Sequence, residues 1–171
     1  MTVDSWDAAC EELGIEEVLD PTQQELNLIR DCGSQFQGQL KDTVQPLAIN
    51  TFGFQDVKKF RSPNKEHIEA AKAANCLLVQ TLKGNEDPMR FIYLDPLNPA
   101  AKGLMFQNPI FQIALNMHWF GQKECACSSF FSMEKLIPLQ TIALIALAID
   151  CAINEWCMGA HTMQVFHAET Y

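Results

Sequence analysis

The sequence predicts an all-α fold, in which a single globular helical domain packs around a central apolar helix and contains little or no sheet. Apolar residues recur at three- and four-residue steps over most of the 171 residues, which is the spacing of one helix face. A capping residue followed by proline precedes three of these segments, at Asp20-Pro21, Ser62-Pro63 and Asn108-Pro109. Hydrophobic residues make up 48% of the chain and charged residues 19%, so we expect a packed core.

The amino-terminal segment carries most of the net charge of -9. Residues 1–29 hold eight acids and no Lys or Arg, which leaves 13 acids against 12 bases in the rest of the chain. Trp6, Cys10 and Leu13 fall at i, i+4 and i+7 before Gly14 and predict one short helix. We therefore expect residues 1–19 to be an acidic amino-terminal extension and residues 20–171 to be the helical domain.

Two long helices are predicted in the first half of that domain. The first begins at Asp20-Pro21, and we expect Pro46 to kink or end it near Gln45. The second begins at Ser62-Pro63 and stops at Lys83-Gly84. The predicted apolar faces are Leu26, Ile29, Gly33, Phe36, Leu40, Val44 and Leu47 in the first helix, and Ile68, Ala71, Leu78, Val79 and Leu82 in the second.

The pattern changes between residues 87 and 102, where three prolines bracket the short apolar run from Phe91 to Leu94. This run is either extended or a tucked-in loop. A further helix is predicted from Asn108-Pro109 to Gly121. Its expected inner face holds Ile110, Ile113, Met117 and Phe120.

The segment from Pro138 to Met158 predicts the central helix, because it is apolar almost all round through Leu147 and ends at Gly159. Asp150 interrupts it, and this acid either lies at a solvent edge, which we favour, or pairs with a buried base such as Arg90. The expected core stripe comprises Leu139, Ile142, Ala146, Ile149, Ile153 and Trp156.

Composition also bears on location. The most apolar stretch, Leu136 to Ile149, is 14 residues long, whereas a membrane span needs about 20 apolar residues, so we expect no membrane span. The amino terminus lacks the basic and apolar regions of a secretion signal. Seven cysteines form an odd set, which predicts reduced thiols in the cytoplasm or nucleus.

No common catalytic or cofactor motif occurs in the sequence. The glycine spacing excludes a dinucleotide fingerprint and a nucleotide P-loop, and we expect no cofactor. The patterns G-x-S-x-G, H-E-x-x-H and C-x-x-C are absent as well. The sequence therefore assigns no catalytic residue.

A zinc site is a weak possibility at the carboxy-terminal end. Cysteine and histidine are the ligands that zinc prefers, but Cys151 and Cys157 are six residues apart and point away from each other on a helix. His161 lies beyond Gly159. The weak metal candidates are Cys151, Cys157, His161 and His167, with Cys125 and Cys127 as further thiols.

Three other features have a structural and a functional interpretation. A thiol nucleophile paired with a histidine base would make the chain an enzyme, with His67, His118, His161 or His167 as the base. We favour core or boundary packing for His118 and core packing for Trp156. The basic run Lys58-Lys59-Phe60-Arg61 is read as a solvated face, with a nuclear-import or phosphate contact as the alternative; the acidic chain makes nucleic-acid binding unlikely.

A set of short motifs in the second half of the chain carries a resemblance to a known family. These motifs are Phe91 to Asp95, Gly103 to Pro109, Trp119-Phe120, Ile137 to Leu139, Ala143-Leu144, Glu155-Trp156, Gly159 and Phe166 to Tyr171. With them the chain resembles a family of mushroom-forming fungi catalogued as domain of unknown function 6532, over most of its length and more loosely from about residue 20 to 82. The resemblance implies an all-helical domain of fungal origin with no established activity and no catalytic residues to transfer. Because family sequences usually continue past Tyr171, it also implies that this chain stops early and is truncated at its carboxy terminus.

The leading hypothesis is a non-enzymatic intracellular helical module that binds a protein partner. The packing pattern is strong, and no residue pattern specifies chemistry. An enzyme with a cryptic Cys/His site and a nuclear or nucleic-acid-associated regulator are the alternatives. The sequence leaves the oligomeric state open.

Overall fold

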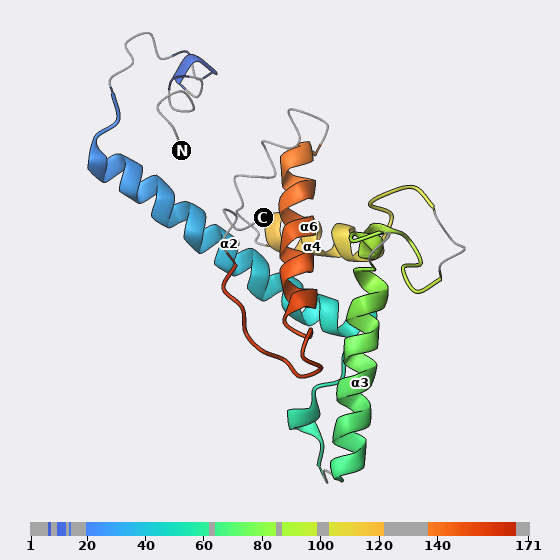
Figure 1. Cartoon of the computed structure of the whole chain (residues 1–171). Coiled ribbons are helices and arrows are strands. Elements are labelled where there is room, and N and C mark those ends of the chain that lie inside the picture. Colours follow the sequence, from blue (N-terminus) through green and yellow to red (C-terminus); the bar gives the residue numbers. More distant parts are fainter. Residues whose placement is uncertain are drawn as a thin grey trace. The chain divides into compact units, whose positions relative to one another are not determined.

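The computed structural model describes residues 7, 10–12, 14, 20–61, 64–84, 87–98, 103–121 and 137–166. Within these residues the fold is all-α, as the sequence predicts, and the β-type pairing is a single isolated bridge between Gly84 and Asp87. The main helices are α2, α3, α4 and α6 (Figure 1). None of the described helices is long and apolar enough to cross a membrane.

The chain divides into two compact units, Met1–Gly38 and Gln39–Tyr171. The first unit contains the start of α2 (Gln23–Phe52), and the second contains the rest of the described helices. Trp6 and Leu13 of the predicted amino-terminal helix lie outside the described residues, whereas Gly14 has the expected left-handed φ of 68°. The acidic extension of residues 1–19 stays a prediction.

Helix α2 begins two residues later than the sequence predicts. Thr22 and Glu25 form a capping box, in which the Thr22 backbone N–H donates to Glu25 Oε2 at 2.7 Å and the Glu25 N–H donates to Thr22 Oγ1 at 3.3 Å. This reciprocal pair satisfies two amides that Asp20 cannot reach from outside the helix. The prediction of Asp20 as the cap is therefore wrong.

Of the two predicted effects of Pro46, the structure rules out the end of the helix near Gln45, because α2 continues through Pro46 to Phe52. Proline removes one backbone hydrogen bond, but Val44, Ala48 and Phe52 on both sides of it are buried, and their packing offsets that loss. The helix ends at Gly53, which has a φ of 83° and donates its N–H to the Ile49 carbonyl at 2.9 Å.

Helix α3 (Lys65–Leu82) follows the short 3-10 helix η1 (Val57–Lys59). Its cap is Asn64, whose Oδ1 accepts from the Glu66 N–H at 3.1 Å, so the predicted start at Ser62-Pro63 is corrected; both of those residues lie outside the described part. The buried residues of α3 are Ala71, Asn75, Val79 and Leu82.

The run from Phe91 to Leu94 is a tucked-in loop rather than a strand. Its first part forms the 3-10 helix η2 (Arg90–Ile92), in which Phe91 and Ile92 are buried. Helix α4 (Pro109–Trp119) then begins as predicted, with Asn108 as its cap and proline at its first turn.

The buried face of α4 is not the predicted one. Ile113, Met117 and Phe120 are exposed, although Ile110 is buried as expected. The neighbouring face packs inward instead and consists of Ile110, Phe111, Ala114, Leu115 and Trp119. Two adjacent faces of this helix are apolar, so periodicity alone cannot select between them.

Helix α6 (Leu139–Asn154) packs against α4 and contributes the largest part of the core. The predicted stripe is buried from Ala146 to Trp156, whereas Leu139 at its start is 69% exposed. The helix ends at Asn154, four residues before the predicted end, and a turn follows to Met158. Gly159 closes this turn with a φ of 77°.

Candidate functional site

A buried carboxylate stands at the carboxy-terminal end of α6. The Glu155 side chain is fully buried, and its Oε1 pairs with Lys41 Nζ at 2.6 Å. Its Oε2 contacts His161 Nε2 at 2.9 Å and accepts from Gln45 Nε2 at 2.8 Å. The Gln164 backbone N–H donates to Oε1 at 2.9 Å, so the carboxylate joins α2 to the segment that follows α6.

The surroundings of Glu155 favour its charged form. Burial alone would raise the pKa of this carboxyl, but the hydrogen bonds from Lys41, the Gln164 N–H and His161 outweigh burial and hold the pKa below its ordinary value. Both oxygens are occupied, and the side chain is not accessible to a substrate. We interpret this group, called the Glu155 cluster below, as a structural link.

A second buried polar group fixes the same segment. Asn75 of α3 donates to the Gln55 and Gly159 carbonyls at 2.9 Å and 2.8 Å and accepts from the Gln55 N–H at 3.0 Å. Gly159 itself lies so close to α3 that an added Cβ would stand 2.5 Å from the Lys72 carbonyl oxygen. A glycine is therefore required there by both its φ and its contact with the helix.

The structure does not bring the metal candidates together as a site. Cys151 is buried within α6, Cys157 is exposed on the following turn, and His161 contacts Glu155. His167, Cys125 and Cys127 lie outside the described residues. Among the residues that the structure describes, no group of three or more His, Cys, Asp or Glu side chains could hold a metal ion.

Two of the cysteines meet across the fold. Cys76 Sγ of α3 donates to the Cys157 carbonyl at 3.4 Å, and Cys157 Sγ lies 3.7 Å from Asn154 Oδ1. These thiol contacts are to oxygen atoms, while the described contacts of His161 are to Glu155, Gln45 and the Trp156 ring. The hypothesis of a thiol nucleophile with a histidine base stays untested.

Asp150 lies near the surface, which was one of the two sequence alternatives. It is also paired with a base, which was the other. Its Oδ1 pairs with Lys83 Nζ at 2.5 Å and its Oδ2 accepts from Asn154 Nδ2 at 2.9 Å, with 14% of the side chain exposed. The base is therefore Lys83 at the end of α3 and not Arg90. Lys83 lies next to α6 in space, which the sequence pattern did not indicate.

The two aromatic candidates are packing residues. Trp156 is 1% exposed and stacks on Phe54 with ring centroids 5.1 Å apart. His118 is half-buried and meets Trp119 edge-on at 4.7 Å, and burial lowers the pKa of this imidazole below its ordinary value.

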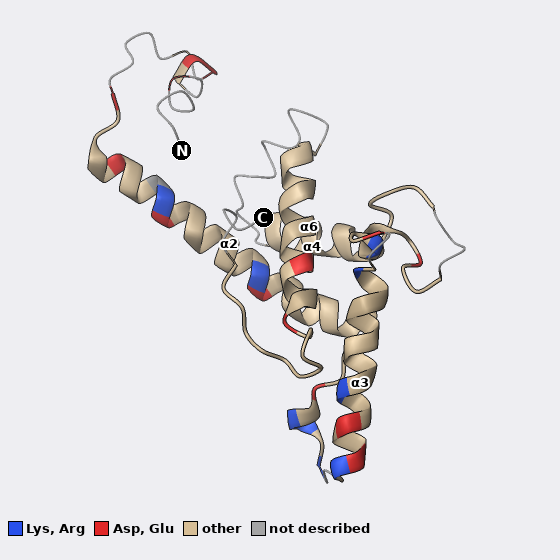
Figure 2. Ribbon diagram, viewed as in Figure 1, with Lys and Arg blue, Asp and Glu red and all other residues tan. Residues whose placement is uncertain are grey.

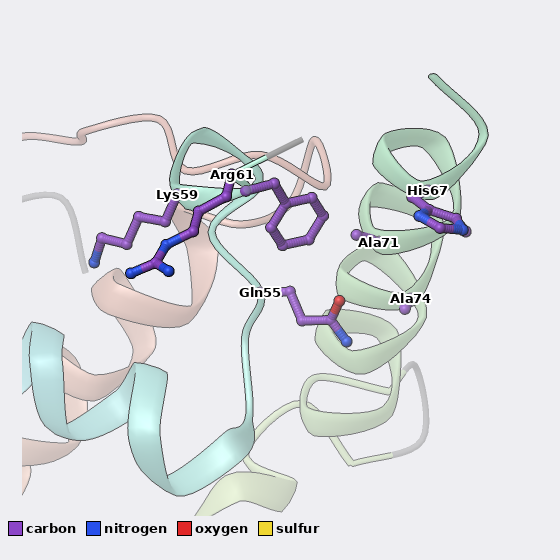
Figure 3. Close-up of a pocket in the computed structure, with 8 residues that line it drawn as sticks. Gln55, Lys59, Arg61, His67, Ala71 and Ala74 are labelled. Atoms are coloured by element: carbon purple, nitrogen blue, oxygen red, sulfur yellow. The ribbon is translucent and has the colours of Figure 1, made fainter. Parts of the chain in front are cut away.

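An open groove lies between η1 and α3, with a volume of about 590 Å³. Gln55, Lys59 and Arg61 come from the η1 side, while Ala71 and Ala74 come from α3 (Figure 3). The Lys59 and Arg61 side chains lie alongside each other, with their charged ends on the same side and directed away from α3 (Figure 3). The remaining lining residues are Phe60, His67 and Ala70.

Basic residues concentrate around this groove, called the η1–α3 groove below. Lys58, Lys59, Arg61 and Lys65 are all exposed and belong to η1 or to the chain leading into α3. Figure 2 shows blue at η1 and at the first turn of α3, with red beside it on α3, where Glu66 and Glu69 are also exposed. Lys59 has an acidic neighbour in Asp56, whose Oδ2 lies 3.7 Å from Lys59 Nζ, but the Lys59 side chain is 79% exposed, so this pair neutralises it little.

A second hollow of about 310 Å³ adjoins the start of α4 and of α6. Its lining is largely apolar and includes Phe111, Leu115 and Ile145. Phe106, also in the lining, has a φ of 62°, which is uncommon for a residue with a side chain, and it meets Phe111 edge-on at 5.4 Å. This hollow offers no charged group among the lining residues described.

Comparison with known families identifies the family of this chain. A family model described as a domain of unknown function, DUF6532, matches residues 1–171, which is the whole chain. The chain belongs to the DUF6532 family. This match confirms the resemblance inferred from the sequence, whereas the fungal origin implied by that resemblance stays an expectation.

Membership of the DUF6532 family brings no activity with it, because the family description states none. A search of curated proteins and a search of solved structures each found no match. The function of this DUF6532 domain must therefore be argued from its own residues.

Sequence reasoning missed the Glu155 cluster, although a signal for it was present. Glu155 stands directly before Trp156 at the end of the most apolar segment, where an acid needs a partner if it is buried. The partners come from Lys41 and Gln45, more than 100 residues away, and the sequence pattern gives no means of selecting them. The one sequence feature that pointed to the η1–α3 groove was the basic run Lys58-Lys59-Phe60-Arg61.

Proposed function

We propose that this chain is a non-enzymatic helical module inside the cell, in the cytoplasm or nucleus, that binds an acidic segment of a partner protein in the η1–α3 groove. The observation that carries the proposal is that two exposed cations, Lys59 and Arg61, and small apolar side chains of α3 line the same groove. These small side chains, the floor of the groove, accept an apolar side chain of the segment. The two cations select acidic residues next to it.

Charge complementarity favours a protein segment over a nucleic acid as the occupant. The four exposed bases at η1 and the start of α3 are few, and the chain as a whole carries a net charge of -9. Nucleic-acid binding requires neutralisation of many phosphates, and an acidic protein repels them. A short acidic peptide needs only the local positive charge and the apolar floor.

The odd set of seven cysteines supports the intracellular part of the proposal. If the chain stays in a reducing compartment, protein taken quickly from cells and denatured without a reductant should show seven titratable thiols. Reproducible protection of several cysteine pairs in freshly lysed cells would count against this location.

The binding test starts from peptides selected on the immobilised protein from a random-peptide phage library. We expect enrichment of sequences with several Asp or Glu residues around one or two apolar residues. A labelled copy of an enriched peptide should lose affinity roughly tenfold, about 1.4 kcal/mol, when Arg61 is replaced by Glu. Fluorescence anisotropy measures this loss, which should shrink at high salt because surface charges are screened.

Two matched controls accompany this test. Arg30→Glu makes the same change of charge at an exposed residue outside the groove lining and should leave the affinity nearly unchanged. Ala74→Leu fills the floor without a change of charge and should weaken binding, whereas Ala73→Leu on the same helix, outside the lining, should not. Equal effects of Arg61→Glu and Arg30→Glu, or tighter binding of a single-stranded RNA of similar length, would contradict the proposal.

A further inference from the structure

The contact between Cys76 and Cys157 joins two residues that are 81 positions apart in the sequence. Cys76 lies on α3 and is half-buried, whereas Cys157 is exposed on the turn after α6. The Cys76 thiol reaches the main chain of Cys157 at 3.4 Å. Among the described residues, this hydrogen bond joins one cysteine residue directly to another.

The pair is held in place on both sides. Asn75, next to Cys76, donates to the Gly159 carbonyl at 2.8 Å, and Lys83 on the same face of α3 donates to Asn154 Oδ1 at 2.8 Å. Asn154 Oδ1 also lies 3.7 Å from the Cys157 thiol, so this thiol stands on the side of the turn that meets α3. These two anchors bracket residues 155–158 and keep them against the helix.

We propose that Cys76 and Cys157 form a reversible disulfide when the protein meets a small-molecule disulfide oxidant such as glutathione disulfide. The Cys76 thiol already contacts the main chain of Cys157, so the two residues are neighbours in the fold. A disulfide needs Cα atoms about 4.4–6.8 Å apart, and its formation here requires the Cys157 side chain to turn from Asn154 toward Cys76. Cys157 is the first to react because it is exposed. This pair is independent of the η1–α3 groove and does not rest on the proposed function.

The reaction takes two exchange steps. The Cys157 thiolate attacks one sulfur of glutathione disulfide, forms a mixed disulfide and releases one glutathione thiolate. The Cys76 thiolate then attacks the Cys157 sulfur of that mixed disulfide and releases the second glutathione. Two protein thiols are oxidised by two electrons in total, and one glutathione disulfide is reduced to two glutathione molecules, with the two thiol protons taken up by the released thiolates.

The cross-link would tie α3 to the turn after α6 and so close a long loop of chain. Such a link restricts the unfolded chain, and we expect the oxidised protein to unfold at a higher denaturant concentration than the reduced protein. Addition of a dithiol reductant should return the midpoint to its original value. The link thus makes the stability of the second unit sensitive to redox state.

The test is treatment of the reduced, folded full-length protein with glutathione disulfide, followed by alkylation, digestion and mass spectrometry. We expect a cross-linked peptide pair that contains Cys76 and Cys157. In Cys76→Ser, the reaction should stop at glutathione bound to Cys157, and in Cys157→Ser the cross-link should be absent. Cys32→Ser, which removes another exposed thiol, should leave the cross-link unchanged.

Three results would overturn the proposal. One is glutathione bound separately to Cys76 and Cys157 without a cross-link. Another is a different dominant pairing, for example with Cys10 or Cys32. The third is an equal yield of the same cross-link from protein oxidised in denaturant, which would show that the fold does not bring the thiols together.

Discussion

Glu155 is the residue on which the end of the fold depends. Its carboxylate receives hydrogen bonds from Gln45 of α2 and from the Gln164 N–H, and it pairs with Lys41 and His161. A buried charge of this kind is tolerated only when its partners are in place, so removal of one partner is costly even where the intact pair adds little net stability.

The first prediction follows from that asymmetry. Glu155→Gln leaves the Lys41 ammonium, which is only 11% exposed, without its counter-ion, and it should lower the free energy of unfolding by about 3–5 kcal/mol at neutral pH. Urea denaturation measures this difference. Glu69→Gln, which removes the carboxylate of an exposed pair with Lys72, should change stability by about 1 kcal/mol or less. Equal small effects would show that Glu155 is not buried as described.

The same residue predicts a pH dependence. Because the pKa of Glu155 is lower in the folded protein than in the unfolded chain, its stabilising contribution is present above the ordinary carboxyl pKa of about 4.3 and is lost as the pH falls through the lower folded value. The stability difference between the wild-type protein and Glu155→Gln should therefore narrow below about pH 4. A difference that stays constant from neutral pH into acid would contradict this assignment.

At the scale of helices, the sequence predicted which segments are helical better than it predicted where each helix begins and ends. Asn108-Pro109 marks the start of α4 correctly, since Asn108 Oδ1 accepts from the Ile110 N–H at 3.1 Å and the proline lies in the first turn. At α2 and α3 a nearer cap, Thr22 or Asn64, supersedes the predicted one. Single-residue signals of similar strength compete within one turn, and only the packed structure decides between them.

The α6 core gives the second prediction. Ile149 is 0% exposed at the centre of the helix, so Ile149→Ala should lower the free energy of unfolding by about 2–5 kcal/mol through the cavity it leaves. Leu139→Ala at the 69% exposed start of the same helix should have an effect below about 0.5 kcal/mol. Similar losses for both variants in chemical denaturation would place the buried face elsewhere.

Pro46 gives the third prediction, which tests the continuity of α2. Proline in a helix interior costs up to about 3 kcal/mol relative to alanine, and Pro46 is exposed, so its ring is not needed for packing. Pro46→Ala should therefore raise the denaturation midpoint. A lower midpoint would mean that the fold needs the kink that the sequence allows at Pro46.

At the scale of the whole molecule, acidic and basic residues concentrate in different parts of the chain. Residues 1–19 carry six acids and no base, whereas exposed bases gather at η1 and the start of α3. Composition made this asymmetry visible without a structure. The groove could not be predicted in the same way, because Ala71 and Ala74 become its floor only when η1 lies beside α3.

Deletion of residues 1–19 tests the predicted division of the chain. If these residues are an extension, the remaining protein should still unfold cooperatively and keep most of its stability, and its net charge should rise by six units. Differential scanning calorimetry would show this directly. Loss of a cooperative transition would show that Trp6 and Leu13 belong to the core.

The central claim is that the η1–α3 groove binds an acidic protein segment, and chemical-shift mapping on the isotope-labelled 19.3 kDa chain tests it most directly. Titration with the selected acidic peptide should shift the backbone amide signals of Lys59, Arg61, Ala70 and Ala74 most strongly. It should leave those of Phe111 and Leu115, which line the apolar hollow, unchanged. Shifts that centre on the hollow, or that spread evenly over the exposed bases, would contradict the claim.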